Sequence, residues 1–268
     1  MNMPRQFSLL ADMTAPDFAQ AVAAKPVILL PLGSHEDHGP HLPMGDYLLA
    51  ETLAGRIAAA ATAQGSRSFA APCLPFGVAD YFGCSPGGLA LSPAAFRVAL
   101  TDLLEGLLRH GLEKIVILNG HGGNVPVIHE VTLKLRRERG LVIPSFYLWK
   151  IARKLMETRV ATARFGHGAE PLLSLTMALR GETVRADDAA PPPQTLLGLK
   201  VSNFGTLDFE GADIDAPAEF DAVPRTAVNT AWPAASAALG QEIADELVAL
   251  GARFVVHVDK ESKEEAAF

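Results

Sequence analysis

Five of the eight histidines in this 268-residue chain lie in three short polar segments that contain glycines, and two of these segments also carry acidic residues. The first segment, residues 33–46, contains Glu36, His38 and Asp46. Side chains two residues apart in an extended segment point to the same side, so we expect Glu36 and His38 to form a pair and Asp37 to point away. Imidazole nitrogens and carboxylates within one short turn suit borderline divalent ions such as Zn²⁺, Mn²⁺ or Fe²⁺. The segment therefore predicts a metal site.

Asp46 stands at the start of an expected helix, where the amide dipoles favour a carboxylate. It could bridge two ions, or it could simply be the helix N-cap. Two other catalytic signatures fit this segment poorly. The spacing of His35 and His38 is one residue short of the helical metalloprotease pattern, and Ser34 lacks the later glycine that a serine-hydrolase elbow requires.

The second segment, residues 119–124, places His121 among glycines at the end of an expected strand. Gly122 and Gly123 let the backbone turn tightly and let a metal or a substrate approach closely. The two asparagines that flank them can brace the turn. A phosphate-cradling loop is the alternative, but the segment has neither a Gly-Lys-Ser/Thr ending nor a dinucleotide glycine pattern.

The third segment, residues 166–170, holds His167 and Glu170 just before an expected helix. Their three-residue spacing puts both on one helical face if the helix begins early, so one could be a ligand and the other a proton-transfer group. The alternative is a capping region with a solvated glutamate. Arg164, close to His167, is a candidate to bind a substrate carboxylate or phosphate, and is otherwise a solvated side chain.

The elements that must position these segments alternate between buried apolar runs and amphipathic stretches, which is typical of βα units around a mostly parallel sheet. Strands are expected at residues 27–32, 114–118, 141–148 and 254–258. Helices are expected at residues 46–63, 93–111, 125–139, 171–179 and 233–250. Residues 187–230 break the pattern and could form a lid, an oligomer contact or a long surface connection. The polar segments occupy the strand ends where ligands gather in open α/β sheets.

Composition narrows the class of protein. Hydrophobic residues make up 49% of the chain, charged residues 20%, and the mean hydropathy is +0.19, which fits a well-buried α/β protein of one large or two small domains. A net charge of -7 and a pI near 5.6 favour a small-molecule substrate over nucleic acid or a membrane surface. The two cysteines predict neither a disulfide framework nor a thiolate zinc site. With no secretion signal or long apolar run, we expect a cytoplasmic protein.

Together, these motifs resemble the creatininase family of dinuclear-metal hydrolases, also called creatinine amidohydrolases. The similarity continues in further motifs at residues 86–88, 167–174 and 232–233. The resemblance implies a single domain over residues 1–268 with a three-layer α/β/α fold around a mostly parallel sheet. It also implies a homo-oligomer, since members of the family are commonly symmetric hexamers.

The resemblance also assigns roles to individual residues. It implies two divalent ions per chain, Zn or Mn first and Fe as the alternative. The implied ligands are Glu36, His38, Asp46 and His121. Asp46 would be the bridging ligand, an assignment that assumes a deletion of one residue before it. His167 stands where the family keeps a catalytic histidine, and the match extends to Glu170.

Two departures from the family pattern bear on the substrate. Creatininase carries Tyr-Glu after the second-motif histidine, with the Glu as a metal ligand, whereas this chain has Gly122 and Gly123, so the shell of the second ion must differ. The tryptophan and aspartate that hold creatinine are replaced by Ala163 and Arg164. Creatinine is therefore not the expected substrate. Related members with Gly-Gly include deformylases of formamidopyrimidine nucleotides and a peptidase that trims a modified peptide.

The expected function is hydrolysis of a C–N bond in a small-molecule amide, cyclic amide or formamide. Two divalent ions would lower the pKa of a bound water from about 15.7 toward ~7 and so supply hydroxide at neutral pH. His167 would deliver a proton to the leaving nitrogen. The alternatives are a peptidase-like member that trims a modified peptide, a metal-free binder of small molecules or phosphate, and a degenerate scaffold.

Overall fold

The structure is a computed structural model of the chain. It describes residues 8–78, 87–161, 163, 165–185, 195–203, 206–216 and 235–265. The expectations that fall on Cys84, Pro86, Arg164 and the motif at 232–233 lie outside these residues, as do parts of the 187–230 segment.

Four parallel strands form the central sheet, in the spatial order β2-β1-β3-β4. Their bounds are Val27–Leu32 for β1, Ser68–Ala70 for β2, Ile115–Asn119 for β3 and Ser145–Tyr147 for β4. Every residue of β1 is buried, because helices cover both faces of the sheet. The pairing of Leu32 with Asn119 brings the carboxyl ends of β1 and β3 to the same edge, where the first two polar segments begin.

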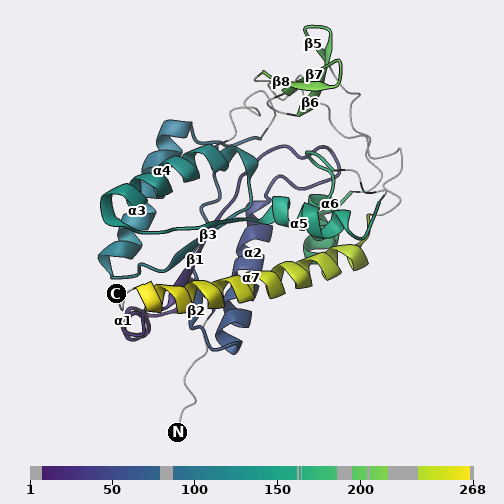
Figure 1. Cartoon of the computed structure of the whole chain (residues 1–268). Coiled ribbons are helices and arrows are strands. Elements are labelled where there is room, and N and C mark those ends of the chain that lie inside the picture. The colour runs from purple at the N-terminus through teal and green to yellow at the C-terminus, as the bar shows by residue number, and fades with distance from the viewer. Residues whose placement is uncertain are drawn as a thin grey trace.

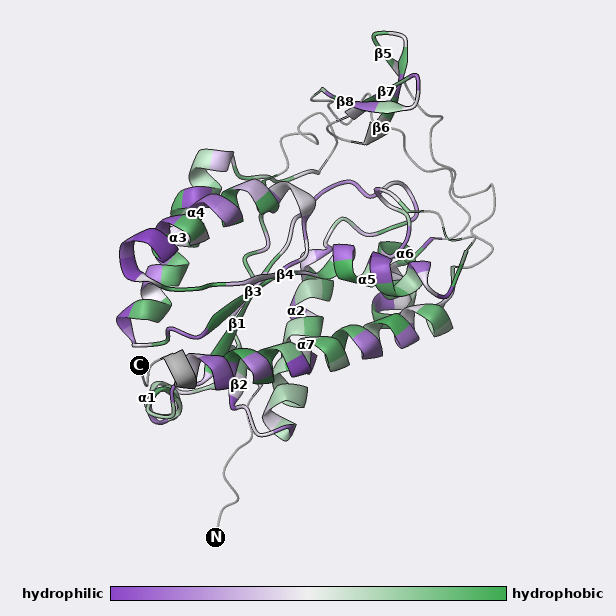
Figure 2. Cartoon of the chain, viewed as in Figure 1, coloured by the Kyte–Doolittle hydropathy of each residue, from purple (hydrophilic) through white to green (hydrophobic). Residues whose placement is uncertain are grey.

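The side chains of β1 alternate between two hydrophobic clusters, one on each face of the sheet. Val27 and Leu29 pack with helices α2, α5 and α7, whereas Ile28 and Leu30 pack with α3 and α4. The helices span Ala15–Val22 (α1), Tyr47–Ala63 (α2), Pro93–Arg109 (α3), Val125–Arg139 (α4), Leu148–Glu157 (α5), Leu172–Arg180 (α6) and Ala237–Glu265 (α7). The strands β1 and β3 are mostly hydrophobic, while the helices around them mix hydrophobic and hydrophilic residues (Figure 2). These layers confirm the expected three-layer α/β/α fold (Figure 1).

Local signals explain where several helices begin and end. Ser92 Oγ accepts the N–H of Ala95 at 3.2 Å, and a proline occupies the first position of α3. Gly140 ends α4 with a φ of 71°, in the left-handed region that favours glycine. The helices expected to start at residues 46, 93, 125 and 171 are confirmed to within about two residues at each end. Within the described ranges, no helix is both long and apolar enough to cross a membrane.

Two of the expected strands are wrong in extent or type. Residues 254–258 continue α7 instead of forming a strand, since a short apolar run fits either element and the buried Ile243, Leu247 and Val255 recur at helical spacing. The strand expected at 141–148 is confined to β4, because α5 begins at Leu148.

A second, antiparallel sheet occupies part of the segment where no strand was expected. Its strands are Thr195–Leu196 (β5), Leu199–Asn203 (β6), Thr206–Phe209 (β7) and Ala212–Asp215 (β8), and it lies apart from the central sheet (Figure 1). Two of its turns have two residues with positive φ, 55° and 75° at Leu197 and Gly198 and 53° and 84° at Glu210 and Gly211. Such turns are usually predicted from an Asn-Gly or Asp-Gly pair in the sequence, and these two turns have neither.

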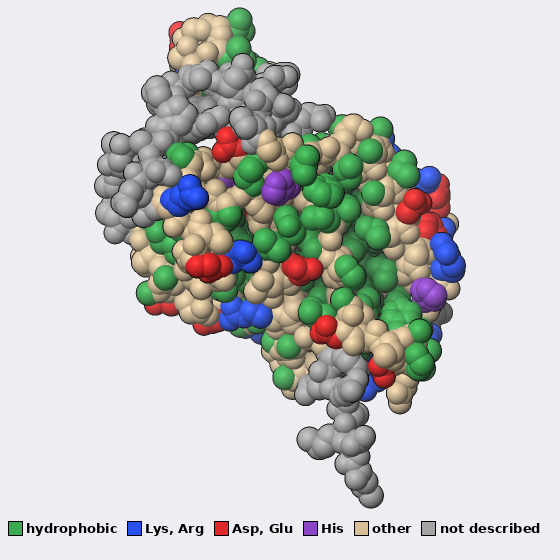
Figure 3. Space-filling view, turned by 180° about the vertical axis from the view of Figure 1, so that it is seen from behind, with side chains coloured by type: hydrophobic (Ala, Val, Ile, Leu, Met, Phe, Trp, Pro, Cys, Tyr) green, Lys and Arg blue, Asp and Glu red, His purple; other side chains and the backbone are tan. Residues whose placement is uncertain are grey.

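The described surface carries both signs of charge. Acidic and basic side chains are interspersed with apolar ones on the face opposite the view of Figure 1 (Figure 3). Arg97 pairs with Glu130 at 2.7 Å, and Arg139 pairs with Glu105 at 2.6 Å, so two ion pairs join α3 to α4. Cys73 is a free thiol, as expected.

Gly240 lets α7 pack closely against α6. A Cβ at this position would collide with the carbonyl oxygen of Ser174, so Gly240→Ala must push the helices apart. We expect a loss of about 1–3 kcal/mol in the free energy of unfolding. The control is Gly106→Ala in α3, where a Cβ meets no atom within 4 Å and higher helix propensity should add roughly 0.5–1 kcal/mol. Urea unfolding measures both; equal stability of the two variants would contradict the proposed packing.

Candidate metal centre

The three polar segments meet at the carboxyl edge of the central sheet. The first follows β1, the second follows β3, and the third lies just before α6. Two hydrogen bonds join the first segment to the third. His41 Nε2 bonds to the carbonyl oxygen of Gly168 at 2.7 Å, and His167 Nε2 bonds to the carbonyl oxygen of Asp37. Residues more than 120 positions apart are thereby held side by side.

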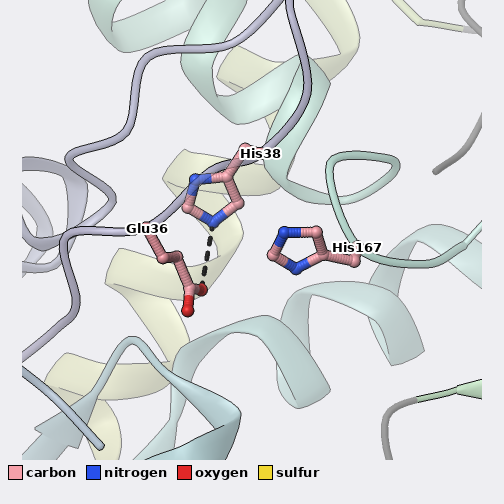
Figure 4. A group of neighbouring side chains, drawn as sticks. All are labelled: Glu36, His38 and His167. Atoms are coloured by element: carbon pink, nitrogen blue, oxygen red, sulfur yellow. Dashed lines mark ion pairs between the residues drawn. The ribbon is translucent and has the colours of Figure 1, made fainter. Parts of the chain in front are cut away.

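Glu36 and His38 point to the same side of the first segment, as expected (Figure 4). His38 Nε2 lies 3.3 Å from Glu36 Oε1, and both side chains are buried. Asp37 turns away, and its carboxylate accepts the N–H of Gly39 at 2.7 Å. Burial raises the pKa of Glu36, but the imidazoles of His121 and His38 outweigh it and hold that pKa well below the usual range. Glu36 is therefore a buried anion.

His121 reaches Glu36 from the second segment, with Nδ1 3.1 Å from Oε1. We assign its Nε2 as the donor to the carbonyl oxygen of Val78 at 2.7 Å, which directs Nδ1 at the carboxylate. Burial lowers the pKa of His121, but the charges of Glu36 and Asp46 prevail and raise it to about 9. Gly123 permits this arrangement, because a Cβ there would collide with the Val78 oxygen and lie 2.6 Å from His121 Nε2.

Asp46 precedes α2, but its side chain does not cap that helix. Its Oδ1 accepts the backbone N–H and the hydroxyl of the buried Ser34, at 2.8 and 3.0 Å. Its Oδ2 lies 3.8 Å from His38 Nε2. Burial raises the pKa of Asp46 to about 6, against the opposing charge of His38. The interpretation of Asp46 as a simple N-cap is therefore wrong. The structure brings this carboxylate into a cluster with Glu36, His38 and His121.

Two asparagines brace the second segment, as expected. Asn119 Nδ2 donates to the carbonyl oxygen of His121 at 2.7 Å, and the His121 N–H donates back to Asn119 Oδ1 at 3.1 Å. Asn124 Oδ1 accepts the N–H of Val78 at 2.9 Å. Asn124 therefore holds the residue whose carbonyl group orients His121.

His167 and Glu170 diverge, because α6 begins only at Leu172 and the two do not share a helical face. The ring of His167 stacks on His38, with centroids 4.8 Å apart and planes inclined by 17° (Figure 4). Burial and the neighbouring His38 lower the pKa of His167 to about 4. Glu170 turns toward α6, where its carboxylate accepts the N–H and the hydroxyl of Ser174 at 3.1 and 2.5 Å. Glu170 is buried and accepts the N–H of Ser174 in the first turn of α6, so the alternative of a solvated glutamate is wrong.

A cavity of about 360 Å³ opens onto the cluster. Gly122 and Gly123 line it, as do His167 and the proposed ligands. Sequence reasoning missed two aromatic residues of the lining, Tyr147 and Trp149. The available signal was their position at the carboxyl end of an expected strand, the same placement that singled out the polar segments.

The described residues form two groups that could each hold a divalent ion, and the ligand atoms within each group lie within 4.8 Å of one another. One group is Glu36, His38 and His167; the other is Glu36, Asp46 and His121. Glu36 is common to both, whereas the resemblance implies Asp46 as the bridge.

The chemistry of these donors fits a metal ion. Glu36 Oε2 and His38 Nδ1 are buried with no hydrogen-bond partner among the residues that the structure describes. Buried polar atoms normally have such partners, so each exception requires an explanation. Carboxylate oxygens and imidazole nitrogens are ligands that zinc and manganese accept. An ion coordinated by the free carboxylate oxygen would account for the orphaned Glu36 atom.

Comparison with solved structures shows the same fold. The structure named "Creatininase Mn" has a TM-score of 0.72, 22% identity, and covers 96% of this chain and 99% of that chain. A mutant creatininase described as "Zn-Zn type" gives the same TM-score, identity and coverage.

Relatives of known name match shorter stretches. The Mycofactocin precursor peptide peptidase of Mycolicibacterium smegmatis is 33% identical over 115 residues, or 42% of this chain and 46% of that protein. The creatinine amidohydrolase of Pseudomonas putida is 30% identical over 148 residues, or 51% and 54%. The chain spans about half the length of these relatives. The family profile described as Creatininase: Creatinine amidohydrolase, in contrast, matches residues 11–255, and by this match the chain belongs to the creatininase family.

Proposed function

We propose that this chain is a metal-dependent amidohydrolase that cleaves a C–N bond in a small-molecule amide, cyclic amide or formamide. The observation that carries the proposal is the pair of ligand groups that share Glu36 and open onto one cavity. Membership of the creatininase family supports it. The names of solved creatininases include Mn and Zn, which are the proposed ions, with Fe as the alternative.

Four side chains would hold two ions, and these are Glu36, His38, Asp46 and His121. When bound, the ions would supply a water whose pKa is lowered from about 15.7 toward ~7, and would polarise the bond under attack. The protein itself orients the side chains that would hold the ions. Ser34 holds one oxygen of Asp46, and Val78 fixes the ring of His121, so both side chains are preorganised.

His167 is the proposed proton-transfer residue. Its lowered pKa keeps the imidazole neutral at pH 7, which is the form that can accept a proton. It would accept the proton released by the attacking water and pass it to the leaving nitrogen. Its stacking on His38 holds the ring at the cavity wall, where both steps must occur.

The remaining predicted site residues have two proposed roles, either positioning other groups or contacting the substrate. Glu170 is assigned a positioning role in place of the expected catalytic one, because Ser174 holds both of its carboxylate oxygens. Gly122 and Gly123 are proposed substrate contacts, since they line the cavity without side chains. Arg164 stays a prediction from the sequence for a substrate with an anionic group.

The relatives named as Mycofactocin precursor peptide peptidases favour a second candidate, cleavage within a short modified peptide. The same ligands and proton-transfer residue would serve it, so only the substrate distinguishes the two. A homo-oligomer, hexameric by family resemblance, and a cytoplasmic location are part of the proposal. Size-exclusion chromatography with light scattering tests the assembly.

Metal content tests the proposed centre directly. Protein purified without chelator or metal-binding tag should contain close to two equivalents of Zn, Mn or Fe per chain by elemental analysis. His38→Ala removes a ligand, so we expect one equivalent or fewer and at least a roughly 10- to 100-fold loss of hydrolysis across cyclic amides, formamides and short peptides. The control is His129→Ala, an exposed histidine of α4.

The metal result also separates the competing functions. His129→Ala should keep both metal and activity. A wild-type protein that holds no metal even after ions are added would favour the metal-free binder or the degenerate scaffold. Full activity of metal-depleted His38→Ala would contradict the proposed chemistry.

Gly123→Ala tests how His121 is held. The added methyl group would collide with the Val78 carbonyl oxygen and tilt the ring, so we expect zinc to bind roughly 10- to 100-fold more weakly with the fold intact. Gly181→Ala is the control, because a Cβ there meets nothing within 4 Å. Competition with a zinc-binding dye gives both affinities. Wild-type affinity in Gly123→Ala would show that the contact with Val78 does not position the ligand.

His167→Asn separates proton transfer from metal binding. If His167 moves protons, this variant should keep its full metal content and lose roughly 10²- to 10⁴-fold in kcat on the best substrate of the panel. Elemental analysis and initial rates measure the two effects on the same sample. Loss of one metal equivalent would instead place His167 among the ligands, with Glu36 and His38.

A further inference from the structure

Tyr147 is brought to the cavity by the central sheet. It is the last residue of β4 and pairs in register with Asn119 at the end of β3, two residues before His121. It also precedes α5, but its side chain makes no capping hydrogen bond. The side chain instead lines the cavity that holds the proposed metal ligands.

The hydroxyl of Tyr147 lies over the backbone of the second polar segment. A Cβ built on Gly122 would be 3.0 Å from Tyr147 Oη, which is tighter than ordinary van der Waals contact. Gly122 directly follows His121 and lines the same cavity. The missing side chain at Gly122 therefore leaves room for the phenol beside a proposed ligand.

The phenol is a hydrogen-bond donor in a cavity that is rich in acceptors. Ionised Glu36 and Asp46 can only accept hydrogen bonds. Trp149 Nε1, the other aromatic donor of the lining, is already bonded to the carbonyl oxygen of Gly120. Tyr147 Oη, by contrast, has no hydrogen-bond partner among the described residues. Its pKa is raised to about 12 by burial and by the two carboxylates, so it keeps its proton at neutral pH.

We infer that Tyr147 Oη binds the substrate, donating a hydrogen bond to the oxygen on the carbon of the scissile C–N bond. That oxygen gains negative charge when water attacks, and the nearby carboxylates would repel it. A fixed neutral donor offsets this repulsion. Its hydrogen bond stabilises the transition state most when it points at the atom on which charge develops. The inference rests on the proposed function, and it adds a substrate-binding donor that none of the three polar segments supplies.

The test uses the Co²⁺-loaded protein with formate as the probe. Formate carries two anionic oxygens on one carbon and is small enough for the cavity, and the visible spectrum of bound Co²⁺ reports both metal uptake and formate binding. We expect Tyr147→Phe to take up as much Co²⁺ as the wild type but to bind formate roughly 10- to 100-fold more weakly. Tyr47→Phe removes a phenol hydroxyl outside the cavity lining and should bind formate like the wild type.

The outcomes separate the inference from the function on which it rests. Equal formate affinity of Tyr147→Phe and the wild type at full Co²⁺ loading overturns the inference and leaves the proposed function intact. Loss of Co²⁺ uptake by Tyr147→Phe would show a structural role and overturns it as well. Failure of the wild type to bind Co²⁺ overturns the proposed function, and the inference with it. On the best substrate, Tyr147→Phe should lower kcat more than it raises KM.

Discussion

Glu36 carries its carboxylate into the protein interior and meets two imidazole rings there, His121 at 3.1 Å and His38 at 3.3 Å. An ionised group can be buried only if opposite charge and hydrogen bonds compensate its lost hydration. The surrounding loops place both imidazole rings so that they compensate this buried charge. The Val78 carbonyl group turns one ring toward Glu36, and the backbone of the first segment points the other the same way. The glycines around the site let these loops approach without side-chain collisions, and the two asparagines hold the loops in place by hydrogen bonds.

The parts of this arrangement that depend on neighbours in the sequence could be predicted. The pairing of Glu36 with His38 needs only the two-residue period of extended chain, and the start of α3 needs only Ser92 and the proline after it. The parallel sheet followed from alternating apolar and amphipathic stretches, which placed the polar segments at one edge. Resemblance to a family supplied the set of distant ligands, and the structure brings all four of them together.

The parts that depend on distant contacts could not be predicted. Locally, Asp46 looks like a helix cap, and only its bonds to Ser34 show that its carboxylate faces the cluster. Tyr147 carries no motif, and its place in the cavity comes from pairing between β3 and β4. Glu170 was expected to face the reaction, yet Ser174, one helical turn later, takes both of its oxygens. Residues 254–258 are apolar enough for a strand, but they continue the helical spacing of α7, and Val255 packs in the same hydrophobic cluster as α2 and the sheet.

The small sheet of β5 to β8 has a different physical character from the three layers that hold the site. Its described core has two buried side chains, Val201 and Leu207, while Leu197 is 85% exposed, Phe209 50% and Ile214 48%. Within the described residues, β5 and β8 each have one unpaired edge, and such edges can hydrogen-bond to a strand of another molecule. Both edges of this small sheet therefore offer backbone groups to a strand of a second molecule. A charge added on an edge strand would oppose such pairing and leave the buried carboxylates of the site unchanged, because they lie in other segments of the chain.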